Sequence, residues 1–303
     1  MKKRIVSMAA LALMMAVTMS ACSENNPYPG YQKNKNGLYY QFYTQNESEM
    51  PQKGDVLEIG LGCMVNDSAR FPFRNDLLKL QDPLFAGDLF EGLAMMHKGD
   101  SASFIVNIDS TFKYMFGQPT LPEEFKSTDV MRFNVKLNDF YPEKVLAQRF
   151  ANDVKNRNAE RAAKLQNDYP EQTAKAAKEL ADYLKKNNII VEPTESGLYY
   201  VVTEAGNGEK PEAGKPVTLH YTGKLLNGTV FDSSVGGEPI SLPIGVGHFV
   251  PGWDEGVMMM SKGEKAVLYV PYYLGYGERD MGEIPPFSNL IFEVELLDFE
   301  TFE

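Results

Sequence analysis

The sequence predicts an α+β protein with two similar domains, each an antiparallel sheet wrapped on a short helix, joined by a helical linker. Three observations predict this fold class. Several short segments alternate apolar and polar residues, which is the period of a half-buried strand. Many of these segments recur at a spacing of about 160 residues. The stretch between the two copies is nearly free of glycine and proline, as a helical segment should be.

Residues 1–21 have the pattern of a signal segment that is removed from the mature protein. Basic residues 2–4 precede a mostly apolar run, residues 5–17, which is too short to span a bilayer comfortably. Small residues then precede Cys22, and the whole segment resembles a bacterial lipoprotein signal that is cleaved before a lipidated Cys22. The alternative is an ordinary secretory signal with an incidental cysteine, because Met19 stands where lipoprotein signals more often carry leucine.

The composition limits how the chain can attach to other molecules. Residues 22–36 are polar and turn-rich, so we expect a flexible tether there. The formal net charge is −11 and would be near −14 without the three basic residues of the signal. No cluster of Lys and Arg follows Cys22, which argues against nucleic-acid binding and against electrostatic adhesion to anionic lipid. We therefore expect a lipid anchor alone. Some bacteria mark lipoproteins for the cell surface with several acidic residues just after the cysteine, and here only Glu24 is acidic, so we expect a periplasm-facing location at the outer membrane.

The first copy of the repeat spans residues 37–142. Its matches to the second copy are short and lie in segments with strand or helix patterns. The matching pairs are residues 37–40 with 197–200, 90–100 with 254–264, and 133–137 with 292–296. If Cys22 is acylated, Cys63 has no cysteine to pair with, so each domain must rest on its hydrophobic core.

Residues 143–190 form the predicted helical linker. Pro170 is the one proline in residues 143–187, so we expect two helices that break or kink there. A narrow apolar stripe with a spacing of three and four residues runs along both helices. It comprises Phe150, Val154, Ala162, Leu165, Tyr169, Ala177, Leu180 and Leu184. This stripe fits either a spacer packed on one domain or a dimerisation helix, in which case the protein would be a homodimer.

The second copy, residues 191–303, carries the most informative stretch. Residues 217–222 and 291–296 alternate as half-buried strands. Between them, Pro251 begins a short helix that holds Trp253, the only tryptophan. We expect Gly263 to close this helix, and Asp254 and Glu255 to complement its dipole.

The order of the short motifs resembles the FKBP family of peptidyl-prolyl cis/trans isomerases over residues 196–299. Each motif is weak alone, but all of them in register are specific. In order they are Leu219-His220-Tyr221-Thr222-Gly223, Phe231-Asp232-Ser233-Ser234, Gly252-Trp253-Asp254-Glu255-Gly256, Gly275-Tyr276-Gly277, Ile284-Pro285-Pro286 and the strand from Leu290 to Leu297. The resemblance implies an isomerase that acts on proline-containing segments of exported proteins and that macrolides can inhibit.

The resemblance also implies the roles of individual residues. Trp253 would form the floor on which the proline ring sits, and Asp232 would hold Tyr221 at the pocket edge. The Tyr276 hydroxyl and the backbone N–H of Val250 would donate hydrogen bonds to the substrate carbonyl. The apolar walls would comprise Tyr221, Phe231, Phe249, Val250, Ile284 and Phe292, with Ile240 and Leu242 further out, where many family members have aromatic residues.

Rotation about an X-Pro bond makes and breaks no covalent bond, so neither a cofactor nor a metal is required. A dry apolar pocket favours the twisted amide, which has less charge separation than the planar one. His97, His220 and His248 show no metal-ligand spacing, and no glycine-rich segment precedes a helix of the phosphate-binding type. The alternatives are a chaperone or assembly factor that binds unfolded chains with little isomerase activity, and an inert scaffold.

The first copy lacks the residues of this site. In register, Leu61 replaces Tyr221, Pro72 replaces Asp232 and Leu89 replaces Trp253. Phe71 survives as the counterpart of Phe231, and residues 121–125 replace the Ile-Pro-Pro loop. We therefore expect a degenerate FKBP-like domain that folds, and that serves as a structural or peptide-binding module.

Overall fold

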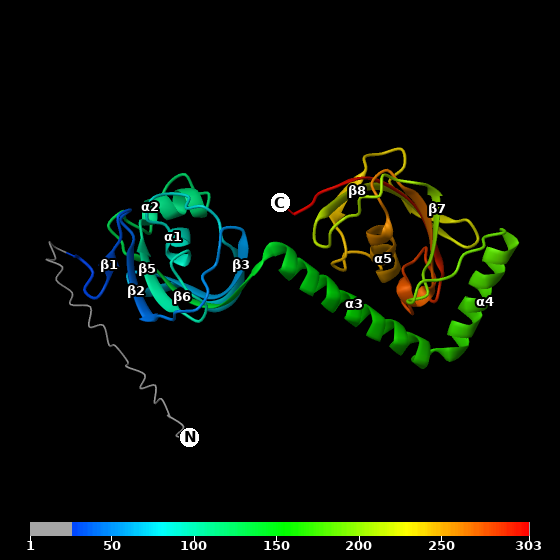
Figure 1. The fold of residues 1–303 in the computed structure, drawn as a ribbon, viewed down its shortest axis with the longest axis horizontal. Helices are drawn as coiled ribbons and strands as arrows, with labels where there is room; N and C mark the ends of the chain where they lie inside the picture. The colour runs from blue at the N-terminus through cyan, green and yellow to red at the C-terminus, as the bar shows by residue number, and fades with distance from the viewer. Residues whose placement is uncertain (1–25, 303) are drawn as a thin grey trace, which may run out of the picture. The chain divides into compact units, whose positions relative to one another are not determined.

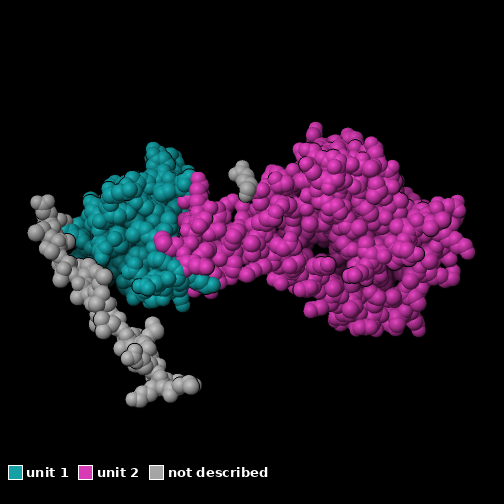
Figure 2. All heavy atoms as spheres, in the orientation of Figure 1, with its two compact units in different colours: residues 1–48, 60–74, 82–136 teal, residues 49–59, 75–81, 137–303 magenta. Residues whose placement is uncertain are grey.

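The computed structural model describes residues 26–302, and its strands form two six-stranded sheets, each accompanied by a short helix (Figure 1). The predicted α+β class is confirmed. The chain divides into two compact units (Figure 2). One holds the described residues before Glu49 together with 60–74 and 82–136, and the other holds 49–59, 75–81 and 137–303. The predicted signal segment and Cys22 lie outside the described residues. Within residues 26–302, no helix combines the length and apolarity that a membrane span needs.

The first sheet has the strand order β1-β2-β5-β6-β3-β4. Its helix α1 follows β4, and its segment after β5 begins with the short helix α2 and a π-helical turn. The bounds are β1 (Gln32–Lys33), β2 (Tyr39–Thr44), β3 (Asp55–Val65), β4 (Ser68–Lys79), α1 (Leu89–Leu93), β5 (Ser101–Val106), α2 (Ile108–Ser110), the π-helical turn η1 (Thr111–Met115) and β6 (Met131–Pro142).

The second sheet has the order β10-β8-β12-β11-β7, with β9 paired to β8. Its bounds are β7 (Tyr199–Glu204), β8 (Pro216–Leu225), β9 (Val230–Ser233), β10 (Ile240–Pro243), α5 (Pro251–Met259), β11 (Lys265–Val270), the 3₁₀ turn η2 (Tyr272–Leu274) and β12 (Leu290–Phe299). Matched by position along the chain, β2-β5-β6-β3-β4 follows the same order as β7-β11-β12-β8-β9/β10. The two copies therefore share one topology.

Equivalent glycines let the central helix approach its sheet in both copies. A Cβ atom on Gly256 of α5 would lie 2.5 Å from a methyl of Leu268 on β11. A Cβ atom on Gly92 of α1 would lie 2.6 Å from the ring of Phe104 on β5. These distances are below van der Waals contact, so a side chain at either position would push the helix off the sheet.

The linker is two helices, α3 (Glu143–Asp168) and α4 (Pro170–Lys186), as the position of Pro170 predicted. Tyr169 lies between them with φ −130° and ψ 58°, because the residue before a proline is disfavoured in the helical region. In Figure 1 the two helices meet at a sharp bend beside the second sheet.

The predicted apolar stripe is right in most positions and wrong in two. Phe150 is 50% exposed, and Ala176 is buried in place of Ala177. Leu180 and Leu184 pack against Tyr269 and Ile291 on the outer face of the second sheet. Both leucines therefore find their apolar partners within the same chain, as expected of a spacer packed on one domain.

The helix around Trp253 is shorter than predicted. It ends at Met259, and Met260 is already extended, so Gly263 does not close the helix. Gly263 instead takes a positive φ of +82° in the tight turn that leads to β11. The buried carboxylate of Glu264 secures this turn by accepting hydrogen bonds from the backbone N–H of Ser261 at 3.1 Å and from its hydroxyl at 2.7 Å. Because the N–H of Ser261 donates to the Glu264 carboxylate, it cannot extend the helix, and the turn is stabilised instead.

Candidate functional site

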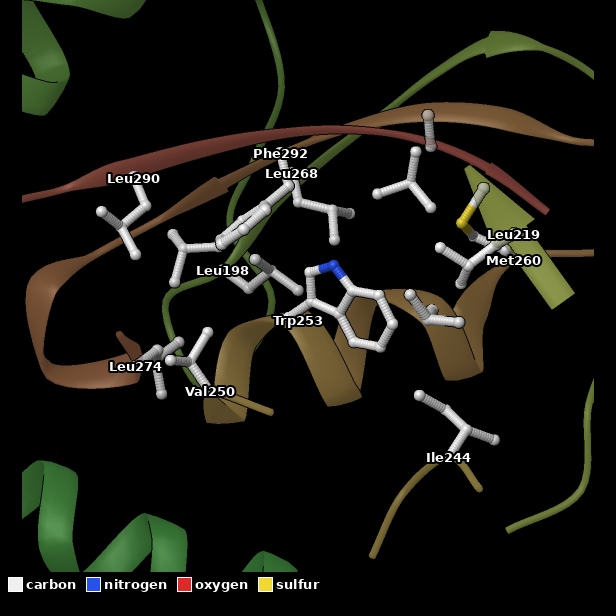
Figure 3. Packing of buried hydrophobic residues seen from close by; sticks show 14 of the residues in the cluster. Leu198, Leu219, Ile244, Val250, Trp253, Met260, Leu268, Leu274, Leu290 and Phe292 are labelled. Carbon is white, nitrogen blue, oxygen red and sulfur yellow. The ribbon is translucent and has the colours of Figure 1, made fainter. Parts of the chain in front are cut away.

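Trp253 lies in the first turn of α5, at the centre of the main hydrophobic cluster of the second domain. Its side chain has 0% exposure, and Figure 3 shows Leu198, Leu268 and Phe292 around the indole. The indole N–H has no hydrogen-bond partner within the described residues. Because the N–H makes no polar contact, packing alone sets the position of the ring. Leaving such a buried donor unpaired typically costs about 1–3 kcal/mol.

Phe249 covers the indole that was predicted to form the pocket floor. The two rings are stacked, with centroids 4.1 Å apart and planes inclined by 24°. Phe249 is itself half-buried and precedes Val250, the N-cap residue of α5. A proline ring that stacks on this face of the indole must therefore displace Phe249, which the sequence did not reveal.

Tyr221 and Asp232 form the polar edge of the site. Strands β8 and β9 pair at Gly223 and Asp232, which brings the carboxylate beside Tyr221. The Tyr221 hydroxyl donates a short hydrogen bond to this carboxylate, as the resemblance implied. Burial, followed by the bond to Asp232, raises the pKa of Tyr221 well above its ordinary value, so the hydroxyl stays protonated.

Tyr276 lies in the loop between η2 and β12 and is half-buried against the same cluster. Burial, and then the negative charge of Asp232, raises the pKa of its hydroxyl. Neither this hydroxyl nor the N–H of Val250 donates a hydrogen bond to any described residue. The site thus holds two uncommitted donors, the ones assigned to the substrate carbonyl from sequence.

The apolar walls converge on the same cluster. Phe231 and Phe292 meet edge to face with centroids 5.8 Å apart, and Val250, Ile284 and Phe292 are buried. The partly buried members are Tyr221, Phe231, Ile240, Leu242, Phe249 and Tyr276. The predicted residues of the C-terminal site therefore lie in or against one cluster, and Asp232 contacts it through its hydrogen bond with Tyr221.

Asp254 and Glu255 do more than complement the helix dipole. The Asp254 carboxylate is 5% exposed and accepts hydrogen bonds from the N–H of Gly247 at 2.8 Å and of Gly245 at 3.3 Å. Glu255 accepts a hydrogen bond from the Thr194 hydroxyl at 2.8 Å. Asp254 thus holds the loop that carries Phe249, a role that sequence reasoning missed, since helix-capping chemistry already explained an acidic residue there.

A cavity of about 820 Å³ lies elsewhere, between α3 and the face of α5 that carries Asp254, Glu255 and Met258. None of the residues predicted for the C-terminal site lines it. Among residues 26–302, no three His, Cys, Asp or Glu side chains are grouped as metal ligands. The candidate site is therefore defined by the Trp253 cluster and its polar edge, and not by this cavity.

The first copy keeps the aromatic frame and loses the polar edge. Phe71 and Phe133 lie 6.2 Å apart, much as Phe231 and Phe292 do, and Leu89 is buried at the tryptophan position. The segment after β5 places Phe112 against two further rings, those of Phe116 and Phe125, at 5.3 and 5.4 Å. This segment of the first copy is thus packed through aromatic rings.

Comparisons with known proteins agree with this geometry. A sequence profile described as FKBP-type peptidyl-prolyl cis-trans isomerase matches residues 207–297. A peptidyl-prolyl cis-trans isomerase of Schizosaccharomyces pombe is 52% identical over 104 residues, which are 33% of this chain and 93% of that protein. The chain therefore belongs to the FKBP-type peptidyl-prolyl cis-trans isomerase family.

Two bacterial relatives extend further along the chain. The FKBP-type peptidyl-prolyl cis-trans isomerase FkpA of Aeromonas hydrophila is 42% identical over 174 residues, 57% of this chain and 62% of its own length. The FKBP-type 22 kDa peptidyl-prolyl cis-trans isomerase of Escherichia coli is 49% identical over 127 residues, 41% of this chain and 60% of its own length. The chain thus matches about three fifths of each of these two relatives.

Proposed function

We propose that this protein is a peptidyl-prolyl cis/trans isomerase whose C-terminal domain carries the activity and whose substrates are proline-containing segments of exported proteins. The observation that carries the proposal is the pair of uncommitted donors beside a buried aromatic floor. The Tyr276 hydroxyl and the Val250 N–H have no partner among the described residues, and the apolar cluster around Trp253 adjoins both. Polar groups at an apolar site need partners, and a substrate carbonyl would supply one.

The chemistry follows from the electronic structure of the amide. The X-Pro bond resists rotation because the planar amide is conjugated, with a barrier of roughly 18–20 kcal/mol. The uncatalysed reaction takes roughly tens to hundreds of seconds. Apolar walls such as Phe231 and Phe292 favour the twisted amide, which is less polar, while the two donors hold its carbonyl. Binding the twisted state more tightly than the planar one is sufficient for catalysis.

Asp232 orders the edge of the site. By accepting the Tyr221 hydrogen bond, its carboxylate fixes that ring beside Trp253, where the two rings meet edge to face at 6.4 Å. Tyrosine is protonated at neutral pH, and burial raises the pKa of Tyr276 further, so its hydroxyl remains a donor. These groups bind and orient the substrate, and no proton needs to leave the protein during the reaction.

A protease-coupled isomerisation assay on the full-length mature chain tests the proposal. We expect faster cis/trans exchange of a hydrophobic-X-Pro peptide, and inhibition by a rapamycin-type macrolide that fills the site over Trp253. Tyr276→Phe removes one donor, and one neutral hydrogen bond is worth about 0.5–1.5 kcal/mol, so kcat/KM should fall roughly twofold to tenfold. A folded wild-type chain with no rate above background would contradict the proposal and favour a chaperone that only binds chains.

The location of the protein is part of the proposal. The basic head, short apolar run and small residues before Cys22 support a lipid anchor on that cysteine, with the domains facing the periplasm from the outer membrane. A lipid anchor survives high salt, unlike an electrostatic contact. We therefore expect the wild type, and not Cys22→Ala, to stay in the membrane fraction after a high-salt wash. Recovery of Cys22→Ala in the washed membranes would refute the anchor.

A further inference from the structure

The two linker helices hold both ends of the loop that carries Tyr276. This loop, residues 275–289, joins η2 to β12 and is called the Tyr276 loop below. At its start, the buried Tyr272 hydroxyl lies 2.6 Å from the Thr173 hydroxyl of α4 and donates to the Leu165 carbonyl of α3 at 3.4 Å. The residue that begins η2 is thus fastened to both linker helices.

The other end of the loop is fastened to α4. The buried Asn289 side chain donates to the Ala176 carbonyl at 2.7 Å and accepts from the N–H of Tyr272 at 3.1 Å. Phe287, which has a positive φ of +61°, packs its ring against Tyr169 at 5.0 Å and Tyr272 at 5.4 Å. A non-glycine residue with this φ is held there by its surroundings, and those surroundings include the junction of α3 and α4.

Two side chains of α3 contact the residues on either side of Tyr276. The Arg161 guanidinium donates a long hydrogen bond, 3.5 Å, to the Gly275 carbonyl. Gly277 has a φ of +70°, and a Cβ atom on it would lie 2.9 Å from Arg161 and 3.1 Å from Leu165. The backbone on both sides of the catalytic hydroxyl therefore rests on α3.

The middle of the loop has no comparable support. Residues 278–283 are all exposed, and Gly282 has a positive φ of +78°. Tyr276 packs against the Trp253 cluster and its carbonyl accepts a hydrogen bond from Arg279 at 3.1 Å, and the linker helices add contacts at its flanks and at the loop ends. Burial and the nearby Arg279 lower the pKa of Arg161, so this guanidinium gives up hydration to remain against the loop.

We infer that α3 and α4 are part of the isomerase itself, because they hold the Tyr276 hydroxyl in place. Arg161, Leu165 and Thr173 are the positioning residues. The inference rests on the proposed function, since it concerns the same site. A donor acts on the twisted amide only if it is already oriented, so misplacing the hydroxyl can cost up to the full effect of that donor, about twofold to tenfold in rate. Loosening α3 should therefore lower kcat while leaving the proline-binding cluster around Trp253 intact.

The full-length chain allows a test with matched controls. Leu165→Ala, Arg161→Ala and Thr173→Val each remove one contact to the loop. We expect kcat for a hydrophobic-X-Pro peptide to fall about fivefold to tenfold for Leu165→Ala, and less for the other two, with KM changed by less than about twofold. Arg157→Ala controls for charge, because Arg157 is exposed one turn earlier on α3. Leu57→Ala controls for lost packing, because Leu57 is fully buried in β3 of the first sheet; it should lower the Tm and leave kcat unchanged.

A double-mutant cycle separates positioning from general stability. If Leu165 acts through the Tyr276 hydroxyl, Leu165→Ala should have little further effect in a Tyr276→Phe background, less than about twofold in kcat. Arg161→Lys should restore part of the rate lost in Arg161→Ala, because a lysine can still donate to a carbonyl. Full additivity with Tyr276→Phe, or an equal kcat loss in Leu57→Ala, would overturn the inference. An inactive wild type would instead contradict the proposed function, so the two failures are distinguishable.

Discussion

Phe249 and Trp253 decide how a substrate reaches the pocket floor. Phe249 stacks on one face of the indole, and the surrounding apolar cluster completes its burial. A stacked aromatic pair is worth about 0.5–1.5 kcal/mol beyond its buried area. A proline ring that displaces Phe249 must first overcome that interaction, so one residue sets part of the affinity.

Replacing Phe249 by alanine should therefore improve substrate binding. We expect Phe249→Ala to lower the KM for a hydrophobic-X-Pro peptide roughly twofold to tenfold, since the stacking energy is no longer lost on binding. Steady-state kinetics on the full-length chain, with the exposed Val235→Ala as a control, measure this. A higher KM would show that Phe249 acts as a wall of the pocket, as the sequence implied, and not as its cover.

Asp254 makes stability depend on pH in a definite direction. Burial raises the pKa of its carboxyl above the ordinary value of 3.8, despite the two backbone N–H donors and the nearby His248. The folded state thus holds this proton more tightly than the unfolded state does. The stabilisation from the protonated form is complete below about pH 4 and is lost as the pH rises through the folded pKa.

Urea titrations of wild type and Asp254→Asn at pH 4 and pH 7 measure the difference in free energy of unfolding. We expect the wild type to lose stability relative to the variant between these values, and an unchanged difference would contradict the assignment.

At the scale of elements, the two short helices owe their positions to glycine. Both α5 and α1 touch a strand through a residue without a side chain, with a virtual Cβ only 2.5 and 2.6 Å from Leu268 and Phe104. Neither neighbour can move freely, because both are fully buried. The helices and strands of each copy are therefore matched in shape as well as in order.

Replacing either of these glycines by alanine should destabilise only the copy that contains it. Overpacking a core typically costs about 1–3 kcal/mol, so Gly256→Ala should destabilise the C-terminal domain and lower isomerase activity by shifting Trp253. Gly92→Ala should destabilise the first copy by a similar amount and leave the activity unchanged. Calorimetry and the isomerase assay on the same samples check both outcomes. Equal activity losses in the two variants would show that the copies do not fold as separate units.

At the scale of the whole molecule, the two copies share a topology but not a site. The first copy retains a buried frame at Leu89, Phe71 and Phe133. It has Pro72 where Asp232 orders the edge of the second copy, and an aromatic group around Phe112 in the segment that follows β5. Strand periodicity can be kept by apolar residues alone, whereas an isomerase site also needs oriented donors.

We therefore expect the first copy to fold without catalysing. A chain of residues 30–142 should show a cooperative melt and an isomerisation rate at background. The aromatic floor and the ordered polar edge are both missing there, because Leu89, Leu61 and Pro72 replace Trp253, Tyr221 and Asp232. The assay compares this chain with the full-length protein at equal concentration. A folded sample within tenfold of the full-length rate would show that Tyr221, Asp232 and Trp253 are dispensable.

The sequence by itself determined the features that depend on short-range rules. Alternation of apolar residues predicted β8 and β12, Pro170 predicted the break between α3 and α4, and the motif order predicted which side chains meet around Trp253. The Tyr221–Asp232 pair was also predicted and is present. The strands and the helix break follow from strand pitch and backbone restriction, which act over a few residues, whereas the residues around Trp253 and the Tyr221–Asp232 pair were implied by the resemblance to the FKBP family.

Only the tertiary structure decided which surfaces touch across long separations. It stacked Phe249 on the indole, turned the Asp254 carboxylate toward a preceding loop, and placed α3 against the loop of Tyr276. It also buried Ile291, which the alternation in β12 assigned to the solvent face, because α4 covers that face. Periodicity states which face of an element is apolar, but the partner of that face depends on how the whole chain packs.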